Sequence, residues 1–134
     1  MKTQNIPEQY QHLSPAGAEV RLLINNEMAG LAHCTLKKGT ISKAVQHKTV
    51  SEFWHVLSGT GQIWRRSGIE ETITSLKKGI TIDIPLGTDF QYRSSEDSDL
   101  IFICFTCPPW PGADEVNYLE MGAWVPNNET PHSR

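Results

Sequence analysis

Short segments of alternating apolar and polar residues, separated by turns that contain glycine, most strongly constrain the fold of this chain. In residues 79–85, for example, Ile80, Ile82 and Ile84 share one face, opposite two polar side chains. Successive side chains of a β-strand point to opposite faces, so this pattern predicts a strand with one buried face. No stretch shows the apolar period of a helix. Many short strands of this kind predict an all-β sandwich or barrel with little or no helix.

The same criteria divide the chain into one β-domain with an extension at each end. The length of 134 residues suits a single domain. We expect an N-terminal arm over residues 1–18, a barrel over 19–107 and a Pro- and Trp-containing tail over 108–134 that packs on the barrel. The strands are expected at residues 19–25, 31–37, 52–57, 62–66, 70–76, 80–84, 90–93 and 100–107.

Charge and hydropathy exclude several classes of partner. The net charge of -3 does not favour a nucleic acid or an anionic membrane as a partner. No apolar run approaches the roughly 20 residues that cross a bilayer, and the first residues have no apolar core of a signal peptide. The sequence therefore predicts a soluble, cytoplasmic protein.

The three cysteines are too few, and odd in number, for a disulfide framework. Cys104 and Cys107 form a CxxC, but they lie in a strand-like run, where residues three apart face opposite sides. A redox pair at a helix start is therefore disfavoured, and buried inert thiols are expected. A zinc site made of Cys34, His33 and these two cysteines lacks a second closely spaced ligand pair.

The stretch between Gly39 and Gly61 holds the candidate functional residues. Its strand pattern places Glu52 and Trp54 on the same inner face, and an inward carboxylate must find a partner or take up a proton. His47, across a short bend, is the nearest candidate partner.

Two residues of the same strand, Phe53 and Leu57, then point outward. An outward apolar row must be covered. The N-terminal arm or a second subunit could cover it, and we favour a two-fold homodimer.

The spacing of this stretch resembles the first signature of the cupin family. It reads Gly39-x5-Val45-x-His47-x4-Glu52-x6-Gly59. A second stretch resembles the second cupin signature in its glycines, its proline and its gaps: Gly79-x5-Pro85-x-Gly87-x2-Phe90-x3-Ser94. The resemblance implies a small single-domain cupin of the RmlC-like superfamily, with a double-stranded β-helix or jelly-roll barrel that is usually dimeric.

The chain departs from the family at two positions that normally hold a metal. Cupins bind transition metals through His, His, Glu and His, and here the first and last of these positions are Val45 and Phe90. His47 and Glu52 remain, and two ligands are fewer than such sites use. We expect no tightly bound metal. The alternative is a weakly held divalent transition metal, with His33 or a cysteine pointing inward as a substitute ligand.

Strand parity and the resemblance together predict the inner wall of the barrel. We expect Glu52 and His47 as candidate catalytic residues, beside a ligand-binding set on neighbouring strands. That set comprises Trp54, Gln62, Trp64, Phe90, Tyr92 and either Cys104 or Cys107, of which we choose Cys104. Such a wall suits a small, partly apolar organic ligand held by a few polar contacts.

Three classes of function remain open. The first is a small-molecule binding protein without a metal. The second is an enzyme: a metal-independent isomerase, epimerase or lyase in which Glu52 and His47 transfer protons, or a degenerate metal-dependent oxygenase. The third is a scaffold in which the Glu52–His47 pair is a buried relic. The fold by itself does not choose between them.

Overall fold

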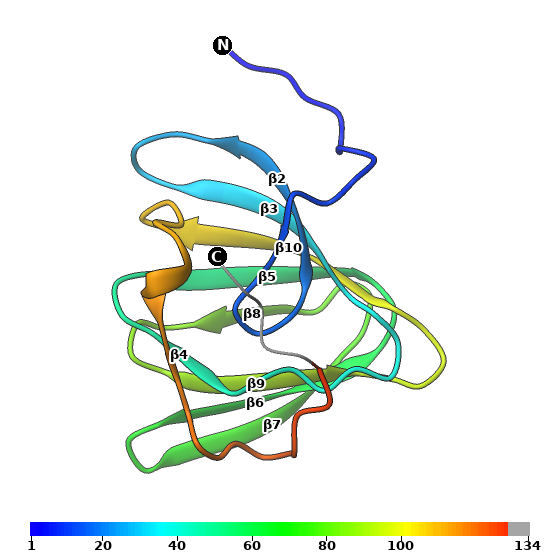
Figure 1. The fold of residues 1–134 in the computed structure, drawn as a ribbon, viewed down its shortest axis with the longest axis vertical. Helices are drawn as coiled ribbons and strands as arrows, with labels where there is room; N and C mark the ends of the chain where they lie inside the picture. Colours follow the sequence, from blue (N-terminus) through cyan, green and yellow to red (C-terminus); the bar gives the residue numbers. More distant parts are fainter. Residues whose placement is uncertain (129–134) are drawn as a thin grey trace.

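The computed structural model describes residues 1–128 and contains two antiparallel sheets that face each other (Figure 1). In this part of the chain the larger sheet has six strands, in the order β1 (His12–Leu13), β2 (Glu19–Asn25), β3 (Gly30–Leu36), β10 (Leu100–Cys107), β5 (Ser51–Ser58) and β8 (Thr81–Ile84). The smaller sheet has the order β11 (Val116–Tyr118), β4 (Val45–His47), β9 (Asp89–Ser94), β6 (Gly61–Ser67) and β7 (Glu70–Leu76). One short 3-10 helix, η1 (Ala113–Glu115), precedes β11. The all-β prediction is confirmed.

Strand alternation creates the core between the sheets. Along β5, Glu52, Trp54 and Val56 are buried, whereas Phe53 and Leu57 are 49% and 37% exposed. β10 is the central strand of the larger sheet because it pairs with β3 on one side and β5 on the other. This position explains why its sequence is apolar on both faces.

The segments outside the predicted barrel make specific contacts with it. β1 pairs with β2, and the backbone N–H of Lys43 donates to the carbonyl of Ala16. At the other end of the chain, β11 pairs with β4, so part of the tail joins the smaller sheet. The sequence did not predict β1, β4, β11 or η1, which are all short and lack a clear period. Residues 129–134 of the predicted tail lie outside the described part of the chain.

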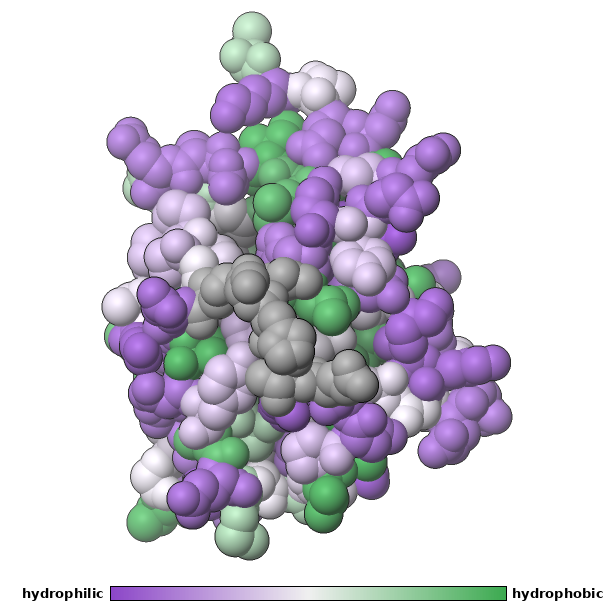
Figure 2. Space-filling view, viewed as in Figure 1, coloured by the Kyte–Doolittle hydropathy of each residue, from purple (hydrophilic) through white to green (hydrophobic). Residues whose placement is uncertain are grey.

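Three observations describe the hydrophobic segments and side chains at the molecular surface. No helix within residues 1–128 is long and apolar enough to cross a membrane. The face shown in Figure 2 is mainly hydrophilic, with hydrophobic side chains in small separate groups. The outward side chains of Phe53 and Phe105 lie together on β5 and β10, with ring centroids 6.0 Å apart. A second subunit over this row stays a prediction.

Candidate functional site

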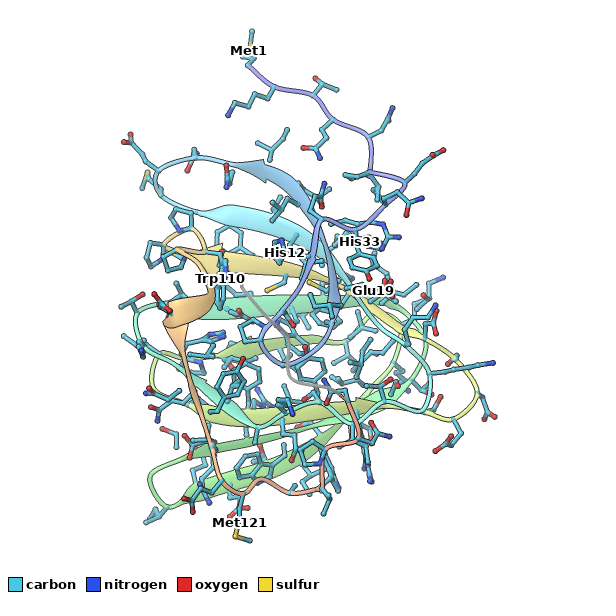
Figure 3. The ribbon with its side chains drawn as sticks, in the orientation of Figure 1. Met1, His12, Glu19, His33, Trp110 and Met121 are labelled. Atoms are coloured by element: carbon cyan, nitrogen blue, oxygen red, sulfur yellow. The ribbon has the colours of Figure 1, made fainter. Side chains whose placement is uncertain are left out.

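A cavity of about 90 Å³ lies between the two sheets. Its lining combines both sheets with residues of the N-terminal arm and of the segment that follows β10. Figure 3 labels one lining residue from each of these extensions, His12 and Trp110. The aromatic side chains of the lining are Trp54, Phe90, Tyr92, Phe102 and Trp110. The cavity is therefore an aromatic, largely buried space, of the kind that small-molecule sites use.

Glu52 provides the carboxylate of this cavity. It lies on β5 and is 7% exposed. Trp54, two residues further along the same strand face, donates from Nε1 to Oε1 of Glu52 at 2.8 Å. The other oxygen, Oε2, lies 3.5 Å from Nε2 of His47. The predicted pairing of His47 with an inward Glu52 is thus present in the structure.

His47 reaches the same point from the opposite sheet. It is the last residue of β4, is 6% exposed, and pairs with Val116 of β11. Its ring meets Phe90 and Trp110 edge-on, with centroid distances of 5.1 and 5.3 Å. Its Nδ1 is buried without a hydrogen-bond partner. A buried polar atom without a partner costs free energy, so the retention of a histidine at this point needs an explanation.

Glu115 of η1 holds the bend between His47 and Glu52. Its side chain accepts from the backbone N–H groups of Thr49 and Val50 at 2.6 and 2.9 Å, and from the hydroxyl of Thr49. Burial by itself would raise the pKa of Glu115, but these hydrogen bonds outweigh it and lower the pKa. The sequence carried no signal for this role, because Glu115 follows a stretch without any period.

Two thiols and a phenol complete the polar content near the carboxylate. Cys104 and Cys34 line the cavity from β10 and β3. Burial, followed by the Glu52 charge, raises the pKa of both thiols. Burial also raises the pKa of Tyr92, which lines the cavity together with Ser14 of the N-terminal arm. Cys107, the other half of the CxxC, is exposed.

These thiols lead to a testable difference in reactivity. In the native protein at neutral pH, iodoacetamide is expected to modify Cys107, because it is exposed. Cys34 and Cys104 are expected to stay unmodified, because they are buried and a raised pKa leaves little reactive thiolate. Intact-mass spectrometry counts the added groups, with the protein in denaturant as the control in which all three cysteines react. Rapid native labelling at Cys104 would contradict the burial of this side chain.

The structure corrects two of the predicted lumen residues, Gln62 and Trp64. Both lie on β6, whose inward face is instead occupied by Ile63, paired with Tyr92 of β9. Gln62 accepts from Nε of Arg93 at 3.0 Å on the outer face. Trp64 donates from Nε1 to Glu71 at 2.7 Å. The prediction was wrong because alternation shows that two residues share a face but does not show which face is inward.

The other predicted lumen residues do come together around the cavity. They are His47, Glu52, Trp54, Phe90, Tyr92 and Cys104. Sequence reasoning missed Phe102, Cys34 and Ser14, and assigned Trp110 only to the packing of the tail. A signal for Phe102 was available, because it lies two residues from Cys104 on β10 and therefore shares the inward face of that strand. Cys34 is the partner of Phe102 across β3 and β10, so it faces the same side.

The residues at the cupin metal positions do not fit a typical metal site. Val45 and Phe90 are neighbours across β4 and β9, at the positions of two expected ligands, and neither can coordinate an ion. Among residues 1–128, no three His, Cys, Asp or Glu side chains are grouped so that they could hold a metal. His33 cannot substitute, because it lies opposite Ile103 on the outward face of β3. Cys34 and Cys104 do point inward, but within residues 1–128 neither completes a group of three donors with His47 and Glu52.

Comparisons with known proteins define the fold. No known family's sequence profile matches the chain, and no curated protein matches it in sequence. Ectoine synthase from P. lautus superimposes with a TM-score of 0.71 over 92% of this chain and 97% of the enzyme, at 18% identity. Pac13 from Streptomyces, a nucleoside dehydratase determined with uridine, gives 0.67 over 89% and 92%, at 14% identity. BH2720 from Bacillus halodurans gives 0.63 over 69% and 72%, at 19% identity.

These similarities show that the chain has the jelly-roll barrel of the cupin fold. The chain covers nearly the whole of ectoine synthase and Pac13, so the likeness extends over the complete barrel rather than over one sheet. The identities are too low to carry an activity from either protein to this one.

Proposed function

We propose that this protein binds a small, partly apolar organic molecule in the cavity between its sheets, without a tightly bound metal. The observation that carries the proposal is the buried Glu52–His47 pair inside an aromatic lining, with Nδ1 of His47 lacking a partner. Protein cores seldom retain such a pair, because burying charged or polar groups costs free energy unless they are fully satisfied. A ligand that completes these contacts accounts for their retention.

The lining assigns a role to each residue. Glu52 and His47 provide the polar contacts that orient the ligand, and Trp54 holds the carboxylate in place through its 2.8 Å hydrogen bond. Phe90 and Phe102 contribute an apolar wall. Placing a few polar groups in an otherwise apolar space is the usual basis of specificity in small-molecule sites.

The indole N–H signals of the tryptophans provide a direct test. The chain has four tryptophans, of which Trp54 lines the cavity and Trp64 lies outside it. In ¹H–¹⁵N spectra, a small aromatic or aliphatic ligand that enters the cavity is expected to shift the Trp54 signal and leave the Trp64 signal unchanged. The Trp54→Phe and Trp64→Phe variants assign the two signals. A library of small organic molecules that shifts neither signal would count against the proposal.

Elemental analysis tests the metal part of the proposal separately. Protein purified without a tag is expected to carry transition metal at far below one ion per chain, because the two available donors are too few. A full complement of one ion per chain would show that further donors join His47 and Glu52, and would overturn this part.

A second candidate function is catalysis by proton transfer, as in a metal-independent isomerase, epimerase or lyase. The observation that favours it is the 3.5 Å separation of Glu52 Oε2 and His47 Nε2, which suits an acid–base pair. In a lyase, one partner would take the proton next to a carbonyl group and the other would give a proton to the departing hydroxyl, releasing water. Pac13, which shares the fold, is a dehydratase.

The Glu52→Gln variant separates the candidate functions. If the protein is an enzyme, this change should abolish turnover while a neutral ligand still binds. If the pair is a buried relic in a scaffold, the change should alter stability alone. The metal-dependent oxygenase, the remaining enzyme candidate, requires more metal ligands than this site provides.

A further inference from the structure

The charge content of the cavity indicates which class of ligand it can hold. Of the described residues that line the cavity, Glu52 is the one carboxylate, and none is a lysine or an arginine. Two histidines, His12 and His47, are the only basic side chains of this lining. A bound phosphate or carboxylate would therefore be buried close to Glu52 without a permanent positive charge to offset its loss of hydration.

The Glu52 carboxylate has acceptor capacity that the protein does not use fully. An ionised carboxylate offers about four lone-pair positions. Oε1 accepts from Trp54 Nε1 at 2.8 Å. Oε2 lies 3.5 Å from His47 Nε2, which is beyond the usual range of a strong hydrogen bond. A ligand donor could therefore reach this oxygen without displacing a good internal contact.

His47 places a second polar group beside the carboxylate. Its Nε2 lies 3.5 Å from Oε2 of Glu52, so a donor that reaches Oε2 also lies close to the imidazole ring. The site thus presents a carboxylate oxygen that lacks a close donor.

The aromatic lining suits the same class of ligand. Ring faces carry negative electrostatic potential and attract cations, and aromatic cages with a nearby carboxylate recognise organic ammonium groups. Here Trp110 and Phe90 contact the edge of His47, and Trp54 contacts Glu52 directly. The rings also shield the carboxylate from water, which strengthens its attraction for a positive charge.

We propose that the ligand is a small primary or secondary organic amine, bound as its ammonium form with the nitrogen against Glu52 and its apolar part among the aromatic rings. This inference rests on the proposed ligand-binding function and names the chemical class of its ligand. An N–H group of the ammonium donates to Oε2 of Glu52. Its positive charge balances the buried carboxylate.

A set of three probes of similar size and different charge tests the inference at neutral pH. The probes are 1-butylamine, which is then an ammonium ion, the neutral 1-butanol and the anionic butyrate. The readout is the shift of the Trp54 indole signal during titration. Butylammonium is expected to bind about tenfold or more tightly than butanol, the factor expected of an added charge-assisted hydrogen bond and cation–π contact. Butyrate is expected not to bind.

Two carboxylate variants provide the matched comparison. Glu52→Gln is expected to remove the preference for butylammonium while butanol still binds. Glu71→Gln is the control, because Glu71 accepts from Trp64 on the outer face much as Glu52 accepts from Trp54 in the cavity. It is expected to leave the preference unchanged. Loss of the preference in Glu71→Gln, or its persistence in Glu52→Gln, would overturn the role of Glu52.

The outcomes distinguish this inference from the proposed function. If butanol or butyrate binds as tightly as butylammonium, the amine inference fails and the ligand-binding proposal stands. If none of the three probes shifts the Trp54 signal, both fail for ligands of this size. The comparison of the three probes on the unsubstituted protein tests the amine inference even if Glu52→Gln does not fold.

Discussion

Replacing Trp54 with alanine is expected to lower the free energy of unfolding by about 3–5 kcal/mol. Trp54 is 2% exposed and its ring stacks on Phe102 at a centroid distance of 3.9 Å. It also meets Tyr92 edge-on at 4.8 Å and donates to Glu52. The substitution therefore enlarges the cavity, removes ring contacts and leaves a buried carboxylate without its best donor.

Urea denaturation measures this loss, and a second variant separates its causes. Trp54→Phe keeps a ring in the cavity wall but removes the indole donor. It is expected to lower the free energy of unfolding by about 1–3 kcal/mol. The difference between the two variants then reports the packing of the ring. A loss in Trp54→Ala no larger than that in Trp54→Phe would show that the ring contributes little, contrary to the stacked geometry.

The second large effect is expected at Gly59, in the turn between β5 and β6. Gly59 has a φ of 80°, and a Cβ atom added there would lie 1.9 Å from the backbone carbonyl oxygen of Asp99. Gly59→Ala is therefore expected to cost about 2–5 kcal/mol, from the left-handed backbone and from the steric clash together. The neighbouring backbone belongs to the turn before β10, so relief of the clash would displace the start of the central strand.

Gly68 provides the matched control for this effect. It has a φ of 61° in the turn between β6 and β7, but a Cβ atom there would meet nothing within 4 Å. Gly68→Ala is expected to lower the free energy of unfolding by about 1–2 kcal/mol, which is the cost of the left-handed backbone alone. Equal losses in the two variants, measured by urea denaturation, would contradict the close approach of the Gly59 and Asp99 backbones.

Strand assignment from the sequence succeeded where alternation was long and flanked by turns. The predicted bounds of residues 19–25, 70–76 and 100–107 agree with β2, β7 and β10. The short strands β1, β4 and β11 escaped detection because two or three residues cannot show a period. Their pairing depends on partners distant in the chain, such as β11 with β4.

The two faces of β6 show why local pattern did not suffice for the site. Trp64 and Ile63 are both almost fully buried, so neither hydropathy nor alternation distinguishes the inward side chain from the outward one. Trp64 pairs with Gln91 of β9. The Gln91 side chain exchanges hydrogen bonds with the backbone of Trp124, so the segment around Trp124 covers the outer face of the sheet at this point. Covering by a distant segment is a tertiary effect that strand propensity does not contain.

The sequence by itself determined the β-class of this protein and the shared inner face of Glu52 and Trp54. These features follow from residue type and from periods of two residues, which are local. Only the tertiary structure decided that Trp64 lies outside the cavity and that Trp110 lies inside it. The packing of one sheet on the other, and of the chain ends on both, depends on contacts between residues far apart in the sequence.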